Sequence, residues 1–426
     1  MKIVLVNYRY FMSSGAEAFL FKCKRLLEAN GHTVIPFSTV NTKNEPTPYA
    51  RYFANARSGE GDVYFGSIKK TPRNLWRMFC GAVYNPDAEK KLRALLRDEK
   101  PDVMLVLQQM NTLSPSVFAA ARKEGVPAVH RLSDFNLICP RYDCLRGGKP
   151  CTHCIRGRYA QAVKSRCVKG SLPATLIRCF AMKCHKWLDM YKSVARFIVP
   201  AAFTASLLEK SGIAKERICH LPTFIDASGI TPVYGNQGYV LFLGRLSPEK
   251  GVDDLITAFS KVQTPGARLV LTGDAPETYL QTLKARAAEL GVSDRVEFTG
   301  FVGGEALTKL IDGALCVALP VLWYENMPNA VLEAYAHGKP AVVSRIGSMT
   351  ETVAENETGL LCEPGDPDSL ARALNRLFDD PQAAENMGRA ARMRCETLYA
   401  PEAYYERLLA VFEAAIAQNA GKERAR

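Results

Sequence analysis

The sequence predicts an α/β protein of two domains, each built around a parallel sheet. Three observations indicate this class. The chain has 426 residues, which is more than one hydrophobic core usually accommodates. Short apolar runs alternate with segments of helical periodicity, and a glycine often closes a run, as in strand–helix units. The runs are continuous, which is typical of strands that are buried on both faces of a parallel sheet.

The second half of the chain shows this alternation most regularly. Strands are predicted at residues 239–243, 268–272, 295–299, 314–319 and 340–344. Helical periodicity is found at 253–261, in a polar stretch that ends at Leu290 before Gly291, at 305–311 and after 328. This order of elements predicts a run of βα units.

The first half has the same style with less regularity. Strands are predicted at 2–7, 33–37, 102–107, 126–130 and 196–199, and helices at 16–30, 87–98, 115–124 and 202–211. Residues 38–86 and 139–190 lack a clear pattern and are predicted as insertions. Proline and glycine punctuate residues 221–238, where we place the domain boundary. We expect a first domain at 1–222, a second at 223–400, and a last helix with a basic tail at 401–426.

The charge is divided unevenly along the chain. Residues 1–222 hold 36 Lys and Arg against 16 Asp and Glu, a net +20, whereas residues 223–426 hold 19 against 27, a net −8. Residues 141–196 alone hold 13 basic and 2 acidic side chains. Such a field favours an anionic partner, which is a nucleic acid, a phospholipid surface or a phosphorylated substrate. A solvated basic face without a ligand is the simpler alternative.

The apolar runs of this chain are short. None approaches the ~20 residues that span a bilayer, and the run at residues 3–6 is too short for a signal peptide. We therefore expect a cytoplasmic protein. Its thirteen cysteines are then expected to be reduced thiols and not a disulfide framework.

The most informative motif surrounds Glu325 and Glu333. Pro328 fits a first helical position and Gly338 fits the residue after the helix end. The backbone amides of residues 326–330 would then face an anion at a helix N-terminus. Carboxylates accept hydrogen bonds from ribose or sugar hydroxyls. The motif therefore predicts a ligand with both phosphate and hydroxyl groups, and the alternative is a surface helix with two solvated glutamates.

A second motif is the turn at residues 244–251, Gly-Arg-Leu-Ser-Pro-Glu-Lys-Gly, which follows a predicted strand. Ligands of open α/β sheets bind outside the carboxyl ends of the strands. Arg245 would bring a forked cation and Lys250 a point charge to a diphosphate. An Arg and a Lys that simply face solvent in a turn are the alternative.

Together these motifs resemble those of family 4 of the glycosyltransferases, which are retaining enzymes with the GT-B fold. In that fold two Rossmann-like domains face each other across a cleft. We also expect the last helix to pack back on the first domain. The resemblance covers most of the chain and is most specific from 238 to about 366. It includes the two motifs above, Gly273-Asp274, Phe298-Thr299-Gly300 and Gly359-Leu360-Leu361.

The resemblance implies roles for these residues in binding a nucleoside diphosphate sugar. Arg245 and Lys250 would hold the diphosphate, Glu333 the ribose, and Glu325 the donor sugar. Two cations and a helix dipole already oppose the charge of the diphosphate, so no divalent metal is implied. The rest of the implied donor-binding set is Gly15, Gly244, Asn326, Met327, Pro328 and Asn329.

Two positions of the first domain extend the resemblance. Gly15 lies in Ser-Gly-Ala-Glu, which is similar to a glycine-rich loop of the family in which serine replaces the first glycine, and it would let the chain approach a phosphate or acceptor. A plain strand-to-helix turn is the alternative. His130 ends a predicted strand and matches a histidine that meets the donor sugar, where the family commonly has an acidic residue next and this chain has Arg131. The resemblance implies His130 and Glu325 as catalytic residues, with orientation and charge stabilisation as the alternative to general-base catalysis.

Cysteines crowd the segment 139–167. A closed four-thiolate zinc site would fold an otherwise coreless basic loop. The spacing is irregular, so free thiols are the main alternative and an iron–sulfur cluster is another. The four predicted ligands are Cys144, Cys151, Cys154 and Cys167, with Cys139 or His153 as a replacement for one of them.

The sequence therefore predicts a retaining glycosyltransferase that moves a hexose-type residue from a nucleoside diphosphate sugar to a hydroxyl acceptor. No cofactor is expected for catalysis. The basic first domain favours an acceptor that is phosphorylated, lipid-linked or part of a surface polysaccharide, reached by peripheral contact with the anionic inner face of a membrane. One alternative is a sugar-nucleotide epimerase of the same fold. Another is a nucleic-acid-binding or zinc adaptor module, although we expect no nucleic acid partner.

Overall fold

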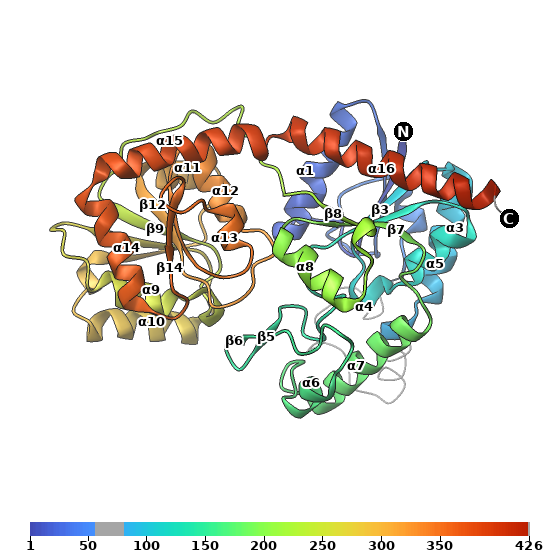
Figure 1. The fold of residues 1–426 in the computed structure, drawn as a ribbon, viewed down its shortest axis with the longest axis horizontal. Coiled ribbons are helices and arrows are strands. Elements are labelled where there is room, and N and C mark those ends of the chain that lie inside the picture. The colour runs from blue at the N-terminus through green and yellow to red at the C-terminus, as the bar shows by residue number, and fades with distance from the viewer. Residues whose placement is uncertain (56–80, 425–426) are drawn as a thin grey trace.

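Residues 1–55 and 81–424, which this computed structural model describes, form two six-stranded parallel sheets in two domains (Figure 1). The first sheet has the order β2-β1-β3-β4-β7-β8 and the second has the order β11-β10-β9-β12-β13-β14. The first contains β1 (Lys2–Asn7), β2 (Thr33–Phe37), β3 (Val103–Gln108), β4 (Ala128–Arg131), β7 (Val194–Val199) and β8 (Ile218–His220). The second contains β9 (Tyr239–Leu243), β10 (Arg268–Thr272), β11 (Val296–Gly300), β12 (Ala314–Leu319), β13 (Ala341–Ser344) and β14 (Gly359–Cys362).

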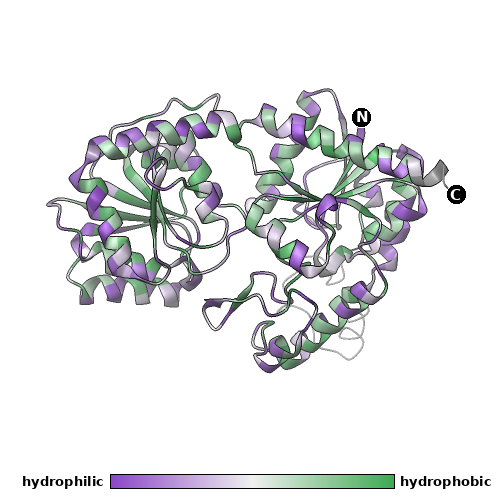
Figure 2. Ribbon diagram, in the orientation of Figure 1, coloured by the Kyte–Doolittle hydropathy of each residue, from purple (hydrophilic) through white to green (hydrophobic). Residues whose placement is uncertain are grey.

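Helices cover both faces of each sheet, which explains the continuous apolar runs of the strands (Figure 2). The first domain has α1 (Gly15–Ala29), η1 (Pro48–Tyr52), α3 (Pro86–Glu99), α4 (Met110–Leu113), α5 (Ser116–Lys123), α6 (Ala160–Lys164), α7 (Leu172–Trp187), α8 (Ala202–Ser211) and η2 (Lys215–Arg217). The second has η3 (Pro248–Lys250), α9 (Val252–Phe259), α10 (Glu277–Glu289), η4 (Ser293–Arg295), α11 (Gly304–Gly313), α12 (Asn329–Ala336), α13 (Met349–Thr352), α14 (Pro367–Asp379) and α15 (Pro381–Leu398).

The last helix, α16 (Pro401–Arg424), crosses back from the second domain to the first (Figure 1). Its Leu408 and Phe412 are fully buried in one apolar cluster with Ile3 and Leu5 of β1. Burial of such a side chain contributes about 1.5–3 kcal/mol. The predicted fold class is therefore confirmed, including the return of the C-terminal helix.

Residues 139–190, which we call the insertion, form a small unit that projects from the first domain (Figure 1). It contains a two-stranded hairpin of β5 (Leu145–Arg146) and β6 (Lys149–Pro150), followed by α6 and α7. Its own apolar cluster is small and centres on Tyr159, Cys179 and Met182. Within the part of the chain that the structure describes, none of the helices combines the length and apolar character needed to cross a bilayer.

Candidate active site

The turn after β9 is shaped by close backbone packing. Gly251 has φ 70°, and a Cβ there would lie 1.9 Å from the Pro320 carbonyl oxygen. Gly273 at the end of β10 has φ 141°, and its Cβ would lie 1.9 Å from the Gly244 carbonyl oxygen. Only glycine fits such positions. The two glycines therefore hold the turn against the carboxyl ends of β10 and β12.

This packing brings Lys250 against Glu325. The Lys250 ammonium donates to Glu325 Oε1 and lies 5.2 Å from the centre of the Trp323 ring. Trp323 Nε1 donates to the same carboxylate oxygen at 2.9 Å, and Ser348 Oγ donates to the Glu325 carbonyl oxygen at 2.7 Å. Lys250 and Trp323 thus orient the Glu325 carboxylate directly, and Ser348 holds the main chain of Glu325.

Arg245 is held much more loosely. Its guanidinium donates to Glu249 Oε1 at 2.8 Å, four residues along the same turn, and its side chain is 63% exposed. An exposed ion pair of this kind contributes only about 0–1 kcal/mol. Arg245 can therefore exchange its carboxylate for another anion at little cost.

Helix α12 begins beside the pair of Lys250 and Glu325. The structure starts the helix at Asn329 with Pro328 as the extended residue before it, so the prediction that Pro328 is the first helical residue was wrong by one position. Glu333 lies half-buried one turn into α12. Burial raises the pKa of Glu333, and Lys22 of the first domain opposes that rise.

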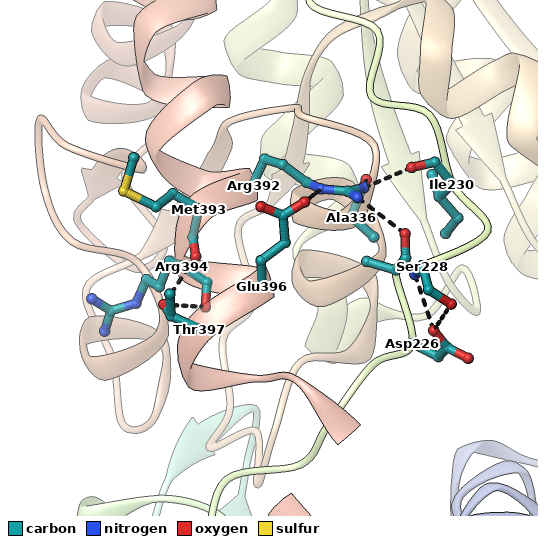
Figure 3. A network of polar contacts seen from close by, with 10 residues as sticks. Asp226, Ser228, Ile230, Ala336, Arg392, Met393, Arg394, Glu396 and Thr397 are labelled. Atoms are coloured by element: carbon teal, nitrogen blue, oxygen red, sulfur yellow. Dashed lines mark hydrogen bonds and ion pairs between the residues drawn. The ribbon is translucent and has the colours of Figure 1, made fainter. Parts of the chain in front are cut away.

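Arg392 of α15 fixes the other end of α12 (Figure 3). Its guanidinium donates to the carbonyl oxygen of Ala336, the last residue of α12. It also donates to the carbonyl oxygens of Ile230 at 2.9 Å and Ala227 at 3.0 Å, in the segment that joins the domains. Glu396 accepts from Arg392 Nε at 2.6 Å. One cation therefore ties the interdomain segment to the helix that carries Glu333.

Asn326 connects this region to the first domain. Its Nδ2 donates to the Leu132 carbonyl oxygen at 2.7 Å, and its Oδ1 accepts from Thr204 Oγ1 at 3.0 Å. A Cβ on Gly15 would lie 3.1 Å from the side-chain nitrogen of Asn329. The start of α12 and its preceding loop therefore face the start of α1 and the end of β4.

His130 is buried at the end of β4, two residues before Leu132. Its Nδ1 lies 3.0 Å from the Val106 carbonyl oxygen, which can only accept, so Nδ1 carries the proton and Nε2 has the lone pair. Burial lowers the pKa of His130 to about 4. The imidazole is therefore neutral near pH 7. It lines a cavity of about 10 Å³ with Asp134, whose pKa burial raises to about 6.

Comparison with known proteins finds similarity to glycosyltransferases. Residues 226–394 match the family model of glycosyl transferases group 1. The chain is 37% identical over 150 residues to an uncharacterized glycosyltransferase of Methanocaldococcus jannaschii, over 35% of this chain and 37% of that one. It is 33% identical over 193 residues to a GDP-mannose-dependent alpha-(1-6)-phosphatidylinositol monomannoside mannosyltransferase of Mycolicibacterium smegmatis, over 41% of this chain and 50% of that one. The matches thus span half or less of these relatives.

Several solved structures align over almost the whole chain, and one of them illustrates the likeness. It is a sucrose-phosphate synthase from Thermosynechococcus elongatus, with a TM-score of 0.71, 19% identity and coverage of 98% of this chain and 99% of that one. The chain has the GT-B fold.

In this GT-B chain the structure brings some of the predicted donor-binding residues together. Lys250 and Glu325 are in direct contact, and Gly15 faces Asn329. Arg245 turns instead to Glu249. The remaining predicted donor-binding positions, which lie along the same turn, loop and helix, are Gly244, Asn326, Met327, Pro328 and Glu333.

Arg131 stands where the family resemblance leads one to expect an acidic residue. It is buried, its guanidinium carbon lies 3.6 Å from the centre of the Phe19 ring, and it donates to Thr223 Oγ1 at 2.8 Å. The side chain therefore braces α1 and the interdomain segment.

Glu351 contributes an interdomain contact that the sequence did not reveal. Its two carboxylate oxygens accept from the backbone nitrogens of Ala202 and Phe203, both at 2.6 Å, at the start of α8. A carboxylate at a helix N-terminus is stabilising. Residues 149 positions apart in the sequence meet here, so no local pattern announces the contact.

Five of the seven cysteines of the insertion line one cavity of about 20 Å³. A hydrogen bond with Cys144 lowers the pKa of Cys139 to about 7. Among residues 1–55 and 81–424, no three His, Cys, Asp or Glu side chains are arranged to hold a metal ion. The structure thus has no preformed zinc site in the described residues, and zinc stays a prediction that metal analysis of the purified chain would check. The thiols lining the cavity are Cys139, Cys144, Cys151, Cys154 and Cys167.

Proposed function

We propose that this chain is a retaining glycosyltransferase that moves a hexose-type residue from a nucleoside diphosphate sugar to a hydroxyl acceptor. The observation that carries the proposal is the contact of Lys250 with Glu325 beside the start of α12. It lies outside the carboxyl ends of the second sheet, where open α/β sheets bind nucleotides. The match of residues 226–394 to glycosyl transferases group 1 supports the same assignment.

Donor binding in this proposal is an exchange of ion pairs. The diphosphate replaces Glu325 as the partner of Lys250 and Glu249 as the partner of Arg245. The backbone amides at the start of α12 and the helix dipole stabilise the remaining negative charge of the diphosphate. Glu325, released from Lys250, accepts from a hydroxyl of the donor sugar. Glu333 accepts from the ribose hydroxyls. Because protein cations oppose the phosphate charge, the proposal includes no divalent metal.

The first domain supplies a neutral imidazole to the reaction. His130 Nε2 accepts a hydrogen bond from a donor-sugar hydroxyl, since Nδ1 donates to the Val106 carbonyl oxygen. The departing phosphate takes the proton of the acceptor hydroxyl, so His130 and Glu325 orient the sugar and stabilise developing charge. Contact between Asn326 and the first domain keeps water from the reacting carbon.

The named relatives favour transfer over epimerisation. The M. smegmatis relative is a mannosyltransferase, and its name gives phosphatidylinositol monomannoside as the acceptor. We propose an acceptor of the same chemical kind, lipid-linked or part of a surface polysaccharide, at the inner face of a membrane. The net +20 charge of residues 1–222 supports an anionic acceptor or surface. Incubation with the donor alone separates the alternatives, because an epimerase would isomerise it.

A thermal-shift panel of UDP-, GDP- and ADP-sugars tests the proposal. A ligand that binds only the folded state stabilises it by about 2.7 kcal/mol at about 100 times its Kd. We expect at least one sugar nucleotide to raise the Tm, and Lys250→Ala to reduce that rise. Lys261→Ala is the matched control, because Lys261 is paired with Asp368 on the surface of the second domain. If no sugar nucleotide raises the Tm, the donor site is wrong.

A further inference from the structure

Helix α7 of the insertion turns an apolar face to the solvent. Residues advance by about 100° each around a helix, which places three large apolar side chains within about 60° of one another. Trp187 is 84% exposed, Leu176 is 48% exposed and Leu172 is 40% exposed. These three side chains are what we call the outer α7 face.

The opposite face of α7 packs against the rest of the protein. Arg178 and Met182 are buried, and His185 Nε2 lies 2.9 Å from the Val83 carbonyl oxygen, which accepts from it. A surface helix normally buries its apolar stripe and exposes polar residues. Here the inward face includes an arginine and a histidine among its buried residues, whereas the outward face carries leucine and tryptophan beside Lys183. Contiguous exposed apolar side chains of this kind mark an interaction surface.

Cations lie on helix α7 and in the segment before it, and Lys183 falls within the angular range of the outer α7 face itself. Lys164 and Arg166 precede the helix, Lys183 and Lys186 lie on it, and all four are exposed. Asp189 is the only acidic residue between positions 144 and 208 of the sequence. An exposed helix that combines leucine and tryptophan with lysines, and that follows a basic segment, has the chemistry of a helix that lies in the interface of an anionic bilayer.

The insertion also stands next to the candidate active site. In Figure 1 the β5–β6 hairpin extends from the first domain toward the second, whereas α6 and α7 lie below the first domain, farther from the second domain than the hairpin. Arg178 on the buried side of α7 donates to the Asn136 carbonyl oxygen at 2.8 Å, six residues after His130. A bilayer that receives the outer α7 face would therefore lie close to the loop that follows β4.

We propose that α7 is a membrane-docking helix, whose outer face enters the headgroup region of a bilayer that contains anionic phospholipid. The neighbouring lysines and arginines contact the phosphate groups, each strengthening binding by about fivefold. The proposal rests on the proposed function only where it brings a lipid-linked acceptor to the cleft. Docking itself requires no sugar transfer.

Co-sedimentation of the full chain with vesicles tests the proposal. Vesicles of phosphatidylcholine are compared with vesicles in which about a third of the lipid is phosphatidylglycerol, at low salt. We expect the wild type to pellet with the anionic vesicles and Trp187 fluorescence to shift to the blue. The double variant Leu176→Ser/Trp187→Ser should lose at least about tenfold in affinity, because both side chains supply the buried apolar area. The double variant Lys183→Glu/Lys186→Glu should lose about as much vesicle affinity, because its acidic side chains are no longer attracted to the anionic headgroups.

The matched control is Phe301→Ser, which removes a side chain that is 77% exposed on the second domain. It should bind vesicles like the wild type. Equal binding by the α7 variants and the wild type overturns the proposal. So does sedimentation velocity that shows a dimer in the wild type and a monomer in Leu176→Ser/Trp187→Ser, because the face would then be a contact between two copies. The sugar-nucleotide thermal shift of the α7 variants should equal that of the wild type, which separates failure of docking from failure of the donor site.

Discussion

The two halves of the candidate active site hold their ionisable groups in opposite ways. In the second domain, Lys250 and Arg245 each rest on a carboxylate of the same domain. In the first domain, His130 and Asp134 share a small cavity, and burial moves their pKa values to about 4 and about 6. The half in the second domain, which we call the charged half, can therefore exchange its carboxylates for an ionic ligand. The half in the first domain, which we call the neutral half, presents a neutral imidazole because burial disfavours the charged form.

The largest effect is expected from neutralising Glu325. Glu325→Gln keeps the size of the side chain but removes the charge proposed to stabilise the reacting sugar, so kcat should fall by about 10²–10³-fold. Donor affinity should persist, because Lys250 keeps its charge for the diphosphate. Steady-state kinetics with the donor identified by thermal shift provides the measurement. Glu249→Gln is the control at the exposed pair, and an equal loss in both variants would contradict a special role for Glu325.

The pH dependence of the free energy of unfolding tests whether His130, in the neutral half of the site, is held without charge. The folded-state pKa of His130 is lowered to about 4 from an ordinary value of 6.5, so its contribution to stability is present above pH 6.5 and is lost as the pH falls toward 4. The shift corresponds to a loss of about 3 kcal/mol at most. His130→Gln can still donate to the Val106 carbonyl oxygen but does not titrate. Its free energy of unfolding should therefore fall less between pH 7.5 and 4.5 than that of the wild type, as measured by urea denaturation.

A matched variant isolates that effect. His153→Gln changes an exposed histidine of the insertion and should follow the wild type through the same pH range. If His130→Gln also follows the wild type, His130 does not titrate as a buried neutral group. The contrast between the two halves of the site would then fail.

Loss of Lys250 should have an intermediate effect. A hydrogen bond to a charged group contributes about 1.5–3 kcal/mol, so Lys250→Ala should weaken donor binding by about 10–100-fold. The expected loss is larger than for Arg245→Ala, because Arg245 is mostly exposed and its interactions are screened. Calorimetric titration with the donor measures both variants. Equal losses would indicate that the two cations share the diphosphate evenly.

The sequence predicted the strands of both sheets well because continuous apolar runs are a strong local pattern. Strands β1 and β2 have the predicted bounds. Helix α7 was not predicted, because its buried side includes Arg178 and His185 while leucine and tryptophan face outward, which inverts the usual periodicity. β8 has only three residues and gives no pattern.

The candidate site was predicted as a set of residues but not as a set of contacts. The turn at 244–251 and the loop at 323–329 are visible as motifs, whereas the ion pair of Lys250 with Glu325 depends on how Gly251 packs on Pro320. Such packing joins positions far apart in the chain. The bond from Asn326 to the first domain and the Glu351 cap on α8 depend on the arrangement of the two domains, which no local pattern contains.

The smallest effect is expected at the contact that joins the two halves. Thr204→Val removes the hydroxyl that donates to Asn326 Oδ1 but leaves the bond from Asn326 Nδ2 to the Leu132 carbonyl oxygen. One neutral hydrogen bond contributes about 1 kcal/mol, so the donor KM should rise by about fivefold while kcat changes little. Thr397→Val, on α15, removes a hydroxyl that bonds within its own helix and is the control. An unchanged KM in Thr204→Val would mean that the charged half of the second domain binds the donor without help from the first domain. The two halves would then differ in function, with only the charged half contributing to donor affinity.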